Sequence, residues 1–276
     1  MKRTALSICI VLLLVAACSS GPQKLENPRE IVQQAIDALG GLEGWNALQD
    51  VTFREIRIRY ENGEPGAERR RINYFKRDHQ GGDKIRIEEE NPNGTRLMVF
   101  DGQEAWGQIS DRVFSGPGAT LGGRGTGARA GMPLRWQSQA TLYFFSLPFK
   151  LLDPGVNLTL EGEESVEGNL CYVVKVTFGE EVGDHSDHSY TFFIDQQSFR
   201  IHKYSFTQWS VEPYTRDVHL PDWQQVGPVV KHMRQVQYLD GKLHAERRWE
   251  ILSVNQGLDD SLFTLPAGSD GGSPNP

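Results

Sequence analysis

The sequence predicts a mainly β protein with a few helices. A strongly curved antiparallel sheet, or unclosed β-barrel, is expected to enclose an N-terminal helix and a mid-chain helix. From residue 51 onward, apolar residues alternate with polar ones in about ten segments, as in half-buried strands. Turn sequences such as Asn62-Gly63 and Asp240-Gly241 join neighbouring segments. Strand follows strand without intervening helices, which favours antiparallel pairing, and about ten such strands in one sheet curl or close.

The N-terminal helix is expected to begin at Pro28. Asn27 is suited to the N-cap, proline to the first helical position, and Glu30 to the last position of a capping box. Apolar residues follow at helical spacing: Ile31, Val32, Ala35, Ile36, Ala38 and Leu39. Gly40-Gly41 is expected to end the helix in a left-handed conformation. An amphipathic helix of this kind must bury its apolar face against another element.

The alternating segments give the expected strands. They span residues 51–60, 71–75, 84–89, 95–101, 104–109, 157–161, 171–179, 189–195, 199–207, 229–239 and 242–255. In the first strand the apolar positions change phase, from Val51 and Phe53 to Ile56 and Ile58. A shift of one residue after Glu55 predicts a β-bulge at that point.

The middle of the chain interrupts the strands. Residues 115–131 are rich in glycine, and we expect an exposed loop there, with a hinged lid as the alternative. A helix is expected to begin at Pro133 and to end or kink at Pro148. One of its faces carries Trp136, Ala140, Tyr143, Phe144 and Leu147. Because the helix is apolar over most of its circumference, it is expected to be buried or to contact a ligand.

The N-terminus has the three parts of a secretory signal peptide. Lys2 and Arg3 precede a short apolar run at residues 5–15, and small residues then lead to Cys18. The ending resembles a bacterial lipobox, which implies that Cys18 is lipidated after cleavage and anchors the protein to a membrane. Ser19 after the cysteine is similar to the pattern sent to the outer membrane. The expected organisation is a signal peptide at 1–17, a lipidated tether at 18–26, one domain at 27–266 and a disordered tail at 267–276.

Charge and motifs argue against nucleic-acid binding, metal binding and catalysis. The net charge of -7 disfavours nucleic acid as a partner. Cys171 lies in an apolar strand segment and is interpreted as an inert buried residue. The run Asp184–His188 offers metal-ligand types but is interpreted as a polar hairpin loop. We therefore expect no catalytic residues, no metal and no cofactor.

Several segments together resemble the periplasmic lipoprotein-carrier superfamily, the LolA/LolB-like proteins. They are residues 35–48, 100–106, 193–201 and 262–266, and the resemblance extends over about residues 28–266. It implies an incomplete β-barrel wrapped around helices, with an apolar cavity that holds acyl chains. The glycine-rich segment at 115–131 and the length of the chain depart from the family pattern.

Three functional hypotheses follow. The first is a non-catalytic, membrane-anchored periplasmic binder of a lipid or acyl chain, with a cavity lined by Trp106, Trp136, Tyr143, Phe144 and Phe192. The second is an envelope lipoprotein whose interior is filled by its own side chains and which docks a protein partner. The third, a hydrolase, is disfavoured because no nucleophile and base stand in a recognisable motif.

Overall fold

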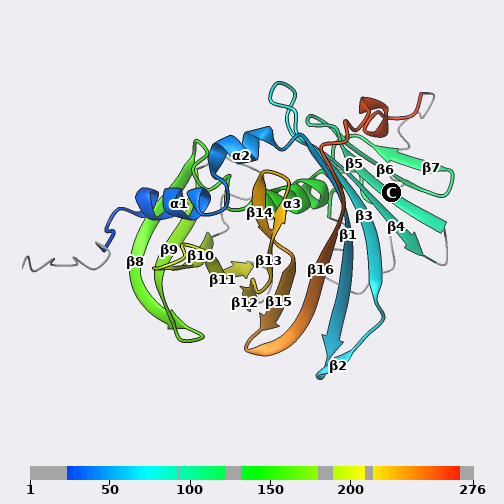
Figure 1. Ribbon diagram of the computed structural model, residues 1–276. Helices are drawn as coiled ribbons and strands as arrows, with labels where there is room; N and C mark the ends of the chain where they lie inside the picture. The colour runs from blue at the N-terminus through cyan, green and yellow to red at the C-terminus, as the bar shows by residue number, and fades with distance from the viewer. Residues whose placement is uncertain (1–23, 92–93, 122–131, 180–188, 209–213, 268–276) are drawn as a thin grey trace, which may run out of the picture.

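The computed structural model describes residues 24–91, 94–121, 132–179, 189–208 and 214–267 (Figure 1). The signal peptide, Cys18 and the metal-ligand types of Asp184–His188 lie outside the described residues. The helices are α1 (Pro28–Asp37), α2 (Gly41–Ala47), α3 (Leu134–Ser146) and the short η1 (Asp260–Leu262).

Two runs of strands make up the sheet. The first run is β1 (Asp50–Glu61), β2 (Glu64–Pro65), β3 (Arg69–Lys76), β4 (Lys84–Asn91), β5 (Gly94–Phe100), β6 (Ala105–Ile109) and β7 (Arg112–Ser115). The second run is β8 (Val156–Val166), β9 (Asn169–Phe178), β10 (Ser189–Asp195), β11 (Ile201–Gln208), β12 (Tyr214–His219), β13 (Trp223–Val226), β14 (Val229–His232), β15 (Arg234–Leu239) and β16 (Lys242–Val254).

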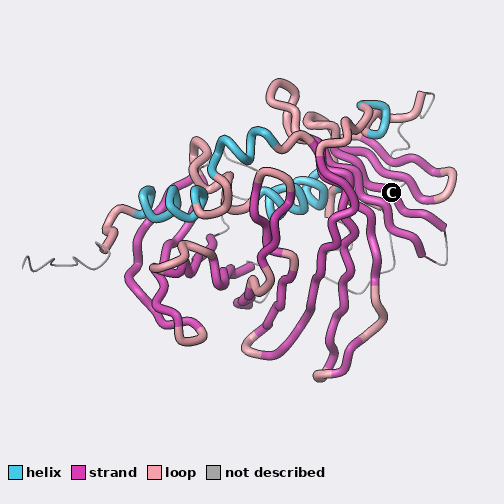
Figure 2. Tube along the Cα trace, in the orientation of Figure 1, coloured by secondary structure: helices cyan, strands magenta, loops and turns pink. Residues whose placement is uncertain are grey.

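All strands of the main sheet pair with antiparallel neighbours, in the order β7-β6-β5-β4-β3-β1-β16-β15-β12-β11-β10-β9-β8. The pairing of β1 with β16 joins the two runs into one sheet. The sheet curves strongly but does not close, and β7 and β8 are its edges (Figures 1 and 2). The expected fold class, an unclosed antiparallel barrel that holds helices, is confirmed.

The helices occupy one end and the concave side of the sheet. In Figure 1, α1 and α2 lie across the upper end, whereas β2 and the β15–β16 turn lie at the opposite end. Helix α3 lies in the chain between the edge strands β7 and β8, and it packs against β4, β5 and β6. Within the described ranges, no helix is both long and apolar enough to span a bilayer.

Helix α1 begins as its sequence indicates. The Asn27 side chain accepts a hydrogen bond from the backbone N–H of Arg29 at 3.0 Å and donates one to Glu30 Oε1 at 3.3 Å. The helix ends at Asp37, and Gly40 follows with a φ of 105°. A side chain at Gly40 would also meet the carbonyl oxygen of Pro228, because its Cβ would lie 2.6 Å from that atom. Glycine therefore serves both the turn and the close contact with the β13–β14 hairpin.

The prediction of a bulge after Glu55 is wrong: the irregularity lies earlier in β1, and the strand does not change face at Glu55. The irregularity in the pairing with β16 lies between Thr52 and Phe53. Beyond it the strand alternates regularly, so Glu55 and Arg57 stay on the buried face that carries Phe53. The apolar positions change phase because the interior of the sheet becomes polar there.

The expected strand at 229–239 is two strands. Residues 229–232 form a separate two-stranded hairpin with β13, and β15 then returns to the main sheet. At the break, the backbone N–H of Met233 bonds to Asp222 and its carbonyl accepts from Trp249. The hairpin leaves the sheet to pack on the helices, and Val230 N–H donates to the Leu39 carbonyl at 2.9 Å.

Candidate functional site

Two adjacent residues of α3 face the two halves of the sheet. The ring of Phe145 stacks on Phe53 of β1 with centroids 4.7 Å apart and contacts Phe75 of β3 at 4.9 Å. The ring of Phe144 stacks on Tyr204 of β11 at 5.9 Å. Consecutive helical side chains point about 100° apart, so α3 lies between the two runs of strands and contacts both.

The half that Phe145 faces is filled by aromatic side chains. Trp45 of α2 stacks on Phe149 at 4.7 Å and on Phe75 at 5.7 Å, and both phenylalanines are fully buried. Lys231 of β14 is also fully buried here, and its Nζ donates hydrogen bonds to the carbonyls of Phe145 and Leu147. Burial lowers the pKa of the Lys231 ammonium to about 7. This region is a solid core that fixes α3 in place.

The half that Phe144 faces carries a second aromatic group, which we call the aromatic cluster. Its members are Tyr143, Phe144, Phe178, Tyr190, Phe192, Tyr204 and Phe206. Tyr143, Phe144, Phe178 and Phe206 are only half-buried although they pack against the main core. The interior side of this half therefore retains partly accessible apolar surface, unlike the Phe145 half.

The tyrosines of the aromatic cluster lie in an apolar environment. Burial raises the pKa of Tyr190 to about 12, and burial also raises the pKa values of Tyr143 and Tyr204 above their usual range. The Tyr143 hydroxyl is buried, and no described atom forms a hydrogen bond with it. A hydroxyl in this position offers one polar contact within an otherwise apolar surface.

The structure brings together three of the five residues that we expected to line the cavity. Tyr143, Phe144 and Phe192 are members of the aromatic cluster. Trp136 lies half-buried nearer the start of α3. Trp106, in contrast to the expectation, packs in a separate core with Val99 and Phe263, and its indole Nε1 donates to the Phe263 carbonyl at 3.1 Å. Trp106 and its register partner Val99 lie on the convex face of the sheet. The C-terminal segment covers this face, so β6 is buried on both sides.

The structure shows which face of α3 is the more buried. Leu134, Ser138, Leu142 and Phe145 lie on its buried face, whereas Trp136 and Tyr143, on the other apolar face, are half-buried. Sequence reasoning also missed Tyr190, Tyr204, Phe178 and Phe206. Their alternation in β9 to β11 was visible, but it did not reveal which face of each strand is concave.

Farther from the helices, the interior face of the sheet carries charged side chains. Glu55 of β1 is 4% exposed and Arg57 is 7% exposed. Burial raises the pKa of the Glu55 carboxyl, but the charges of Arg247, Arg71 and Arg57 outweigh it, so the pKa lies below its ordinary value. On the neighbouring strands, Arg71 forms a 3.0 Å ion pair with Glu89. The interior thus changes from apolar to charged along the strands.

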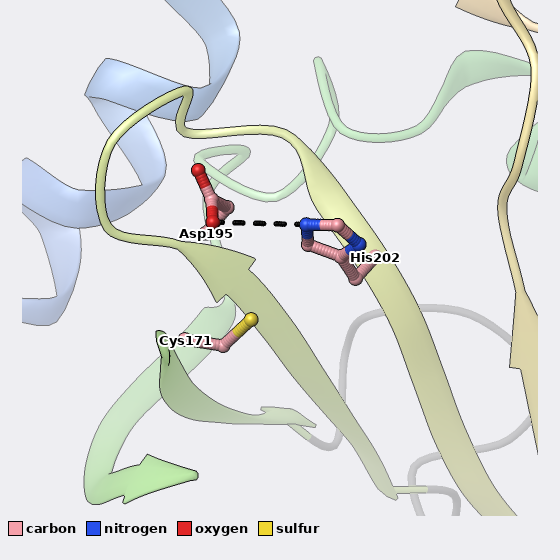
Figure 3. Close-up of side chains that lie close together, drawn as sticks. All are labelled: Cys171, Asp195 and His202. Carbon is pink, nitrogen blue, oxygen red and sulfur yellow. Dashed lines mark ion pairs between the residues drawn. The ribbon is translucent and has the colours of Figure 1, made fainter. Parts of the chain in front are cut away.

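A second group of chemically capable side chains lies on β9, β10 and β11. The ligand atoms of Cys171, Asp195 and His202 all lie within 4.8 Å of one another (Figure 3). Asp195 Oδ1 accepts hydrogen bonds from the backbone N–H groups of Gln197 and Ser198, and Oδ2 lies 3.7 Å from His202 Nε2. Burial raises the pKa of Cys171 to about 11, so the thiol keeps its proton at neutral pH. The hydrogen bonds of Asp195 hold the turn between β10 and β11.

Solved structures share the overall arrangement. A DUF1329 family protein from Desulfovibrio piger superposes with a TM-score of 0.59 at 12% identity, over 86% of this chain and 97% of its own. An outer membrane lipoprotein-sorting protein domain from Vibrio parahaemolyticus gives 0.56 at 14% identity, over 85% and 94%. A LolA superfamily protein from Nitrosomonas europaea gives 0.55 at 12% identity, over 87% and 99%. The fold is LolA-like.

About a third of the chain also matches a sequence family. Residues 133–219 match the model of a family of unknown function, DUF6503. This match contains α3 and the whole aromatic cluster, from Tyr143 to Phe206. A search of curated proteins finds no significant match to this chain.

Proposed function

We propose that this protein is a lipid-anchored, non-catalytic binder of an apolar ligand, a lipid or acyl chain, in the bacterial envelope. The ligand lies against the aromatic cluster on the concave face of the sheet. The observation that carries the proposal is the difference between the two sides of α3. Around Phe145 the interior is solid, whereas around Phe144 apolar side chains remain half-buried.

Burial of this surface supplies the binding energy. Removing apolar surface from water contributes about 25 cal/mol per Å², or about 0.8 kcal/mol for each CH₂ group. A chain of ten or more methylenes against Phe144, Phe178 and Phe206 would therefore bind without a dense set of polar anchors. The hydroxyl of Tyr143 offers one polar contact on this surface.

The fold and the N-terminus support the proposed location. Outer membrane lipoprotein sorting is in the name of one protein of similar fold, and LolA superfamily in the name of another. The lipobox-like ending at Cys18 supplies the membrane anchor, and Ser19 favours the outer membrane with the domain in the periplasm. Both features agree with a protein that handles lipids at the membrane surface.

The proposal is tested by titrating the purified protein with N-phenyl-1-naphthylamine, an uncharged apolar dye. We expect saturable binding, weakened about tenfold or more by Phe144→Ala because a half-buried ring of the binding surface is lost. The matched control is Leu252→Ala, which removes a side chain that is 46% exposed on β16. If the dye does not bind, or if both variants weaken its binding equally, the alternative is favoured. In that alternative the interior is filled by the protein's own side chains and the outer surface docks a protein partner.

A further inference from the structure

The interior charges form a band across the sheet, which follows from the strand register. Residues directly opposite each other on neighbouring strands point to the same face of the sheet. Each interior residue therefore identifies the interior residue on the next strand. Glu55 lies opposite Arg71 on β3 and Trp249 on β16, and Arg57 lies opposite Arg247. Arg71 lies opposite Glu89, and Glu89 lies opposite Arg96 on β5. The band therefore crosses the sheet without a break from β5 to β16.

The band reaches the aromatic cluster on the other side. On β12, Arg216 lies two residues before Val218 of the core and therefore on the same interior face. Its Cζ is 5.5 Å from the ring centroid of Phe206. Arg247 and Arg216 both act on the hydroxyl of Tyr204, whose pKa burial raises and these two charges lower. Cationic and aromatic side chains are thus in direct contact on one interior surface.

Arginines outnumber carboxylates in the described part of this band. Among the residues that the structure describes, it contains Arg57, Arg71, Arg96, Arg216 and Arg247 and two carboxylates, Glu55 and Glu89. His244, at the irregularity in β16, responds to the excess: burial lowers its pKa, and the charges of Arg216, Arg59 and Arg57 lower it further. Guanidinium groups that line a partly apolar interior favour an oxyanion as an additional hydrogen-bonding partner.

We infer that the ligand is an anionic amphiphile whose oxyanion headgroup, a carboxylate, phosphate or sulfate, is held by the interior arginines. Its apolar chain lies against the aromatic cluster. This inference rests on the proposed function and specifies the substrate class. Guanidinium groups suit the role because their planar fork donates two parallel hydrogen bonds to an oxyanion. The Nε atoms of Arg96 and Arg247 are buried, and no described atom accepts a hydrogen bond from either.

The wild-type protein alone tests the inference. 11-(Dansylamino)undecanoic acid and its methyl ester have the same chain and differ in charge. We expect the acid to bind about tenfold more tightly, because a hydrogen bond to a charged group adds at least this factor. Equal affinities would overturn the inference and leave the proposed function standing. Binding of neither probe would contradict the proposed function itself.

Two neighbouring arginines provide a matched pair of variants. Arg247 lies on the interior face of β16, whereas Arg248 lies on the convex face and pairs with Glu246 at 2.7 Å. Arg247→Gln is expected to reduce the preference for the acid over the ester, and Arg248→Gln to leave it unchanged. Arg247→Lys retains the charge and is expected to keep part of the preference. A preference that survives Arg247→Gln and Arg96→Gln would contradict the role of the band.

A final comparison separates a lipid headgroup from a free oxyanion. Decyl phosphate is expected to displace the dansyl acid at far lower concentration than inorganic phosphate, because only decyl phosphate has a chain to place on the aromatic cluster. Inorganic phosphate that competes as strongly as decyl phosphate would assign the arginines to a free anion and overturn the inference.

Discussion

Trp249 of β16 donates a hydrogen bond from its indole Nε1 to Glu55 Oε2 of β1, at 3.5 Å. The two residues are partners in register and mark the boundary between the apolar and the charged parts of the interior. The indole ring contacts Phe53 and Phe145, with centroids 6.1 and 6.4 Å away, and Glu55 on its other side meets arginines. One pair thus joins the packed core to the charged band.

Glu55→Gln is expected to destabilise the protein by about 3 kcal/mol at pH 7, because it leaves buried arginines without their carboxylate. The pKa of Glu55 is lowered in the folded state from an ordinary value of 4.5, so the carboxylate stabilises the fold above that pH. This contribution is lost as the pH falls through the folded-state pKa. The difference in urea midpoint between variant and wild type is therefore expected to shrink below pH 4.5. Glu250→Gln, which breaks a largely exposed ion pair with Arg54, is the control and is expected to change stability by less than about 1 kcal/mol.

Lys231→Met is expected to change how stability depends on alkaline pH. Burial lowers the pKa of Lys231 from 10.5 to about 7, so between these values the unfolded chain binds one proton more than the folded protein. The stability of the wild type therefore rises with pH in this window, by at most about 1.4 kcal/mol per pH unit. The variant lacks this slope, whereas Lys175→Met, which replaces a partly exposed lysine on β9, retains it. If the stability of the wild type and of Lys231→Met depends on pH in the same way, Lys231 is not a buried amine with a lowered pKa.

Phe145→Ala and Phe144→Ala are expected to separate stability from binding. Phe145 is 1% exposed and contacts Phe53 and Phe75, so its truncation is expected to destabilise the fold by about 3–5 kcal/mol. Phe144 is half-buried, and its truncation is expected to cost clearly less stability. Thermal denaturation of both variants measures the contrast. Equal losses would mean that the interior is as solid around Phe144 as around Phe145.

Asp50→Ala is expected to loosen the segment after β16. The buried carboxylate of Asp50 accepts hydrogen bonds from the backbone N–H groups of Gln256 and Gly257, at 2.9 and 2.8 Å. Its loss leaves these donors unpaired and is expected to cost about 2 kcal/mol. Hydrogen exchange at residues 256–258 is expected to accelerate. Asp259→Ala, which removes only the exposed cap of η1, is expected to leave this exchange nearly unchanged.

Cys171 is expected to resist alkylation in the folded protein. The side chain is fully buried and its pKa is raised to about 11, so little thiolate is present or accessible at pH 8. Peptide mapping after iodoacetamide treatment is expected to show modification of Cys171 in urea only. Rapid modification of the native protein would contradict an inert structural thiol and revive a chemical role for the group with His202.

The fold was largely predictable because alternation and turn signals are local. The capping of α1 by Asn27 and the antiparallel succession of strands depend on residues close in sequence. The inner and outer faces were harder to assign. Ile56 and Ile58 look like core residues, yet Glu55 and Arg57 occupy the interior positions. Apolar residues do not mark the inside of a sheet whose interior is itself partly charged.

Trp106 shows a second limit. The convex side of β5 and β6 is covered by the C-terminal segment, so both faces of these strands are buried. The covering residue Phe263 is distant in sequence, and no local pattern announces its position. The charged band was missed for a similar reason, because its members come from β1, β3, β4, β5, β12 and β16 and meet only through the register.

Native mass spectrometry with organic extraction, on protein purified from a bacterial envelope, tests the central claim most directly. We expect a co-purified lipid or fatty acid that carries an anionic group and is released on denaturation, and we expect it to be lost from the Phe144→Ala protein. A clean apo mass, together with no uptake of added N-phenyl-1-naphthylamine, would contradict a ligand-binding interior.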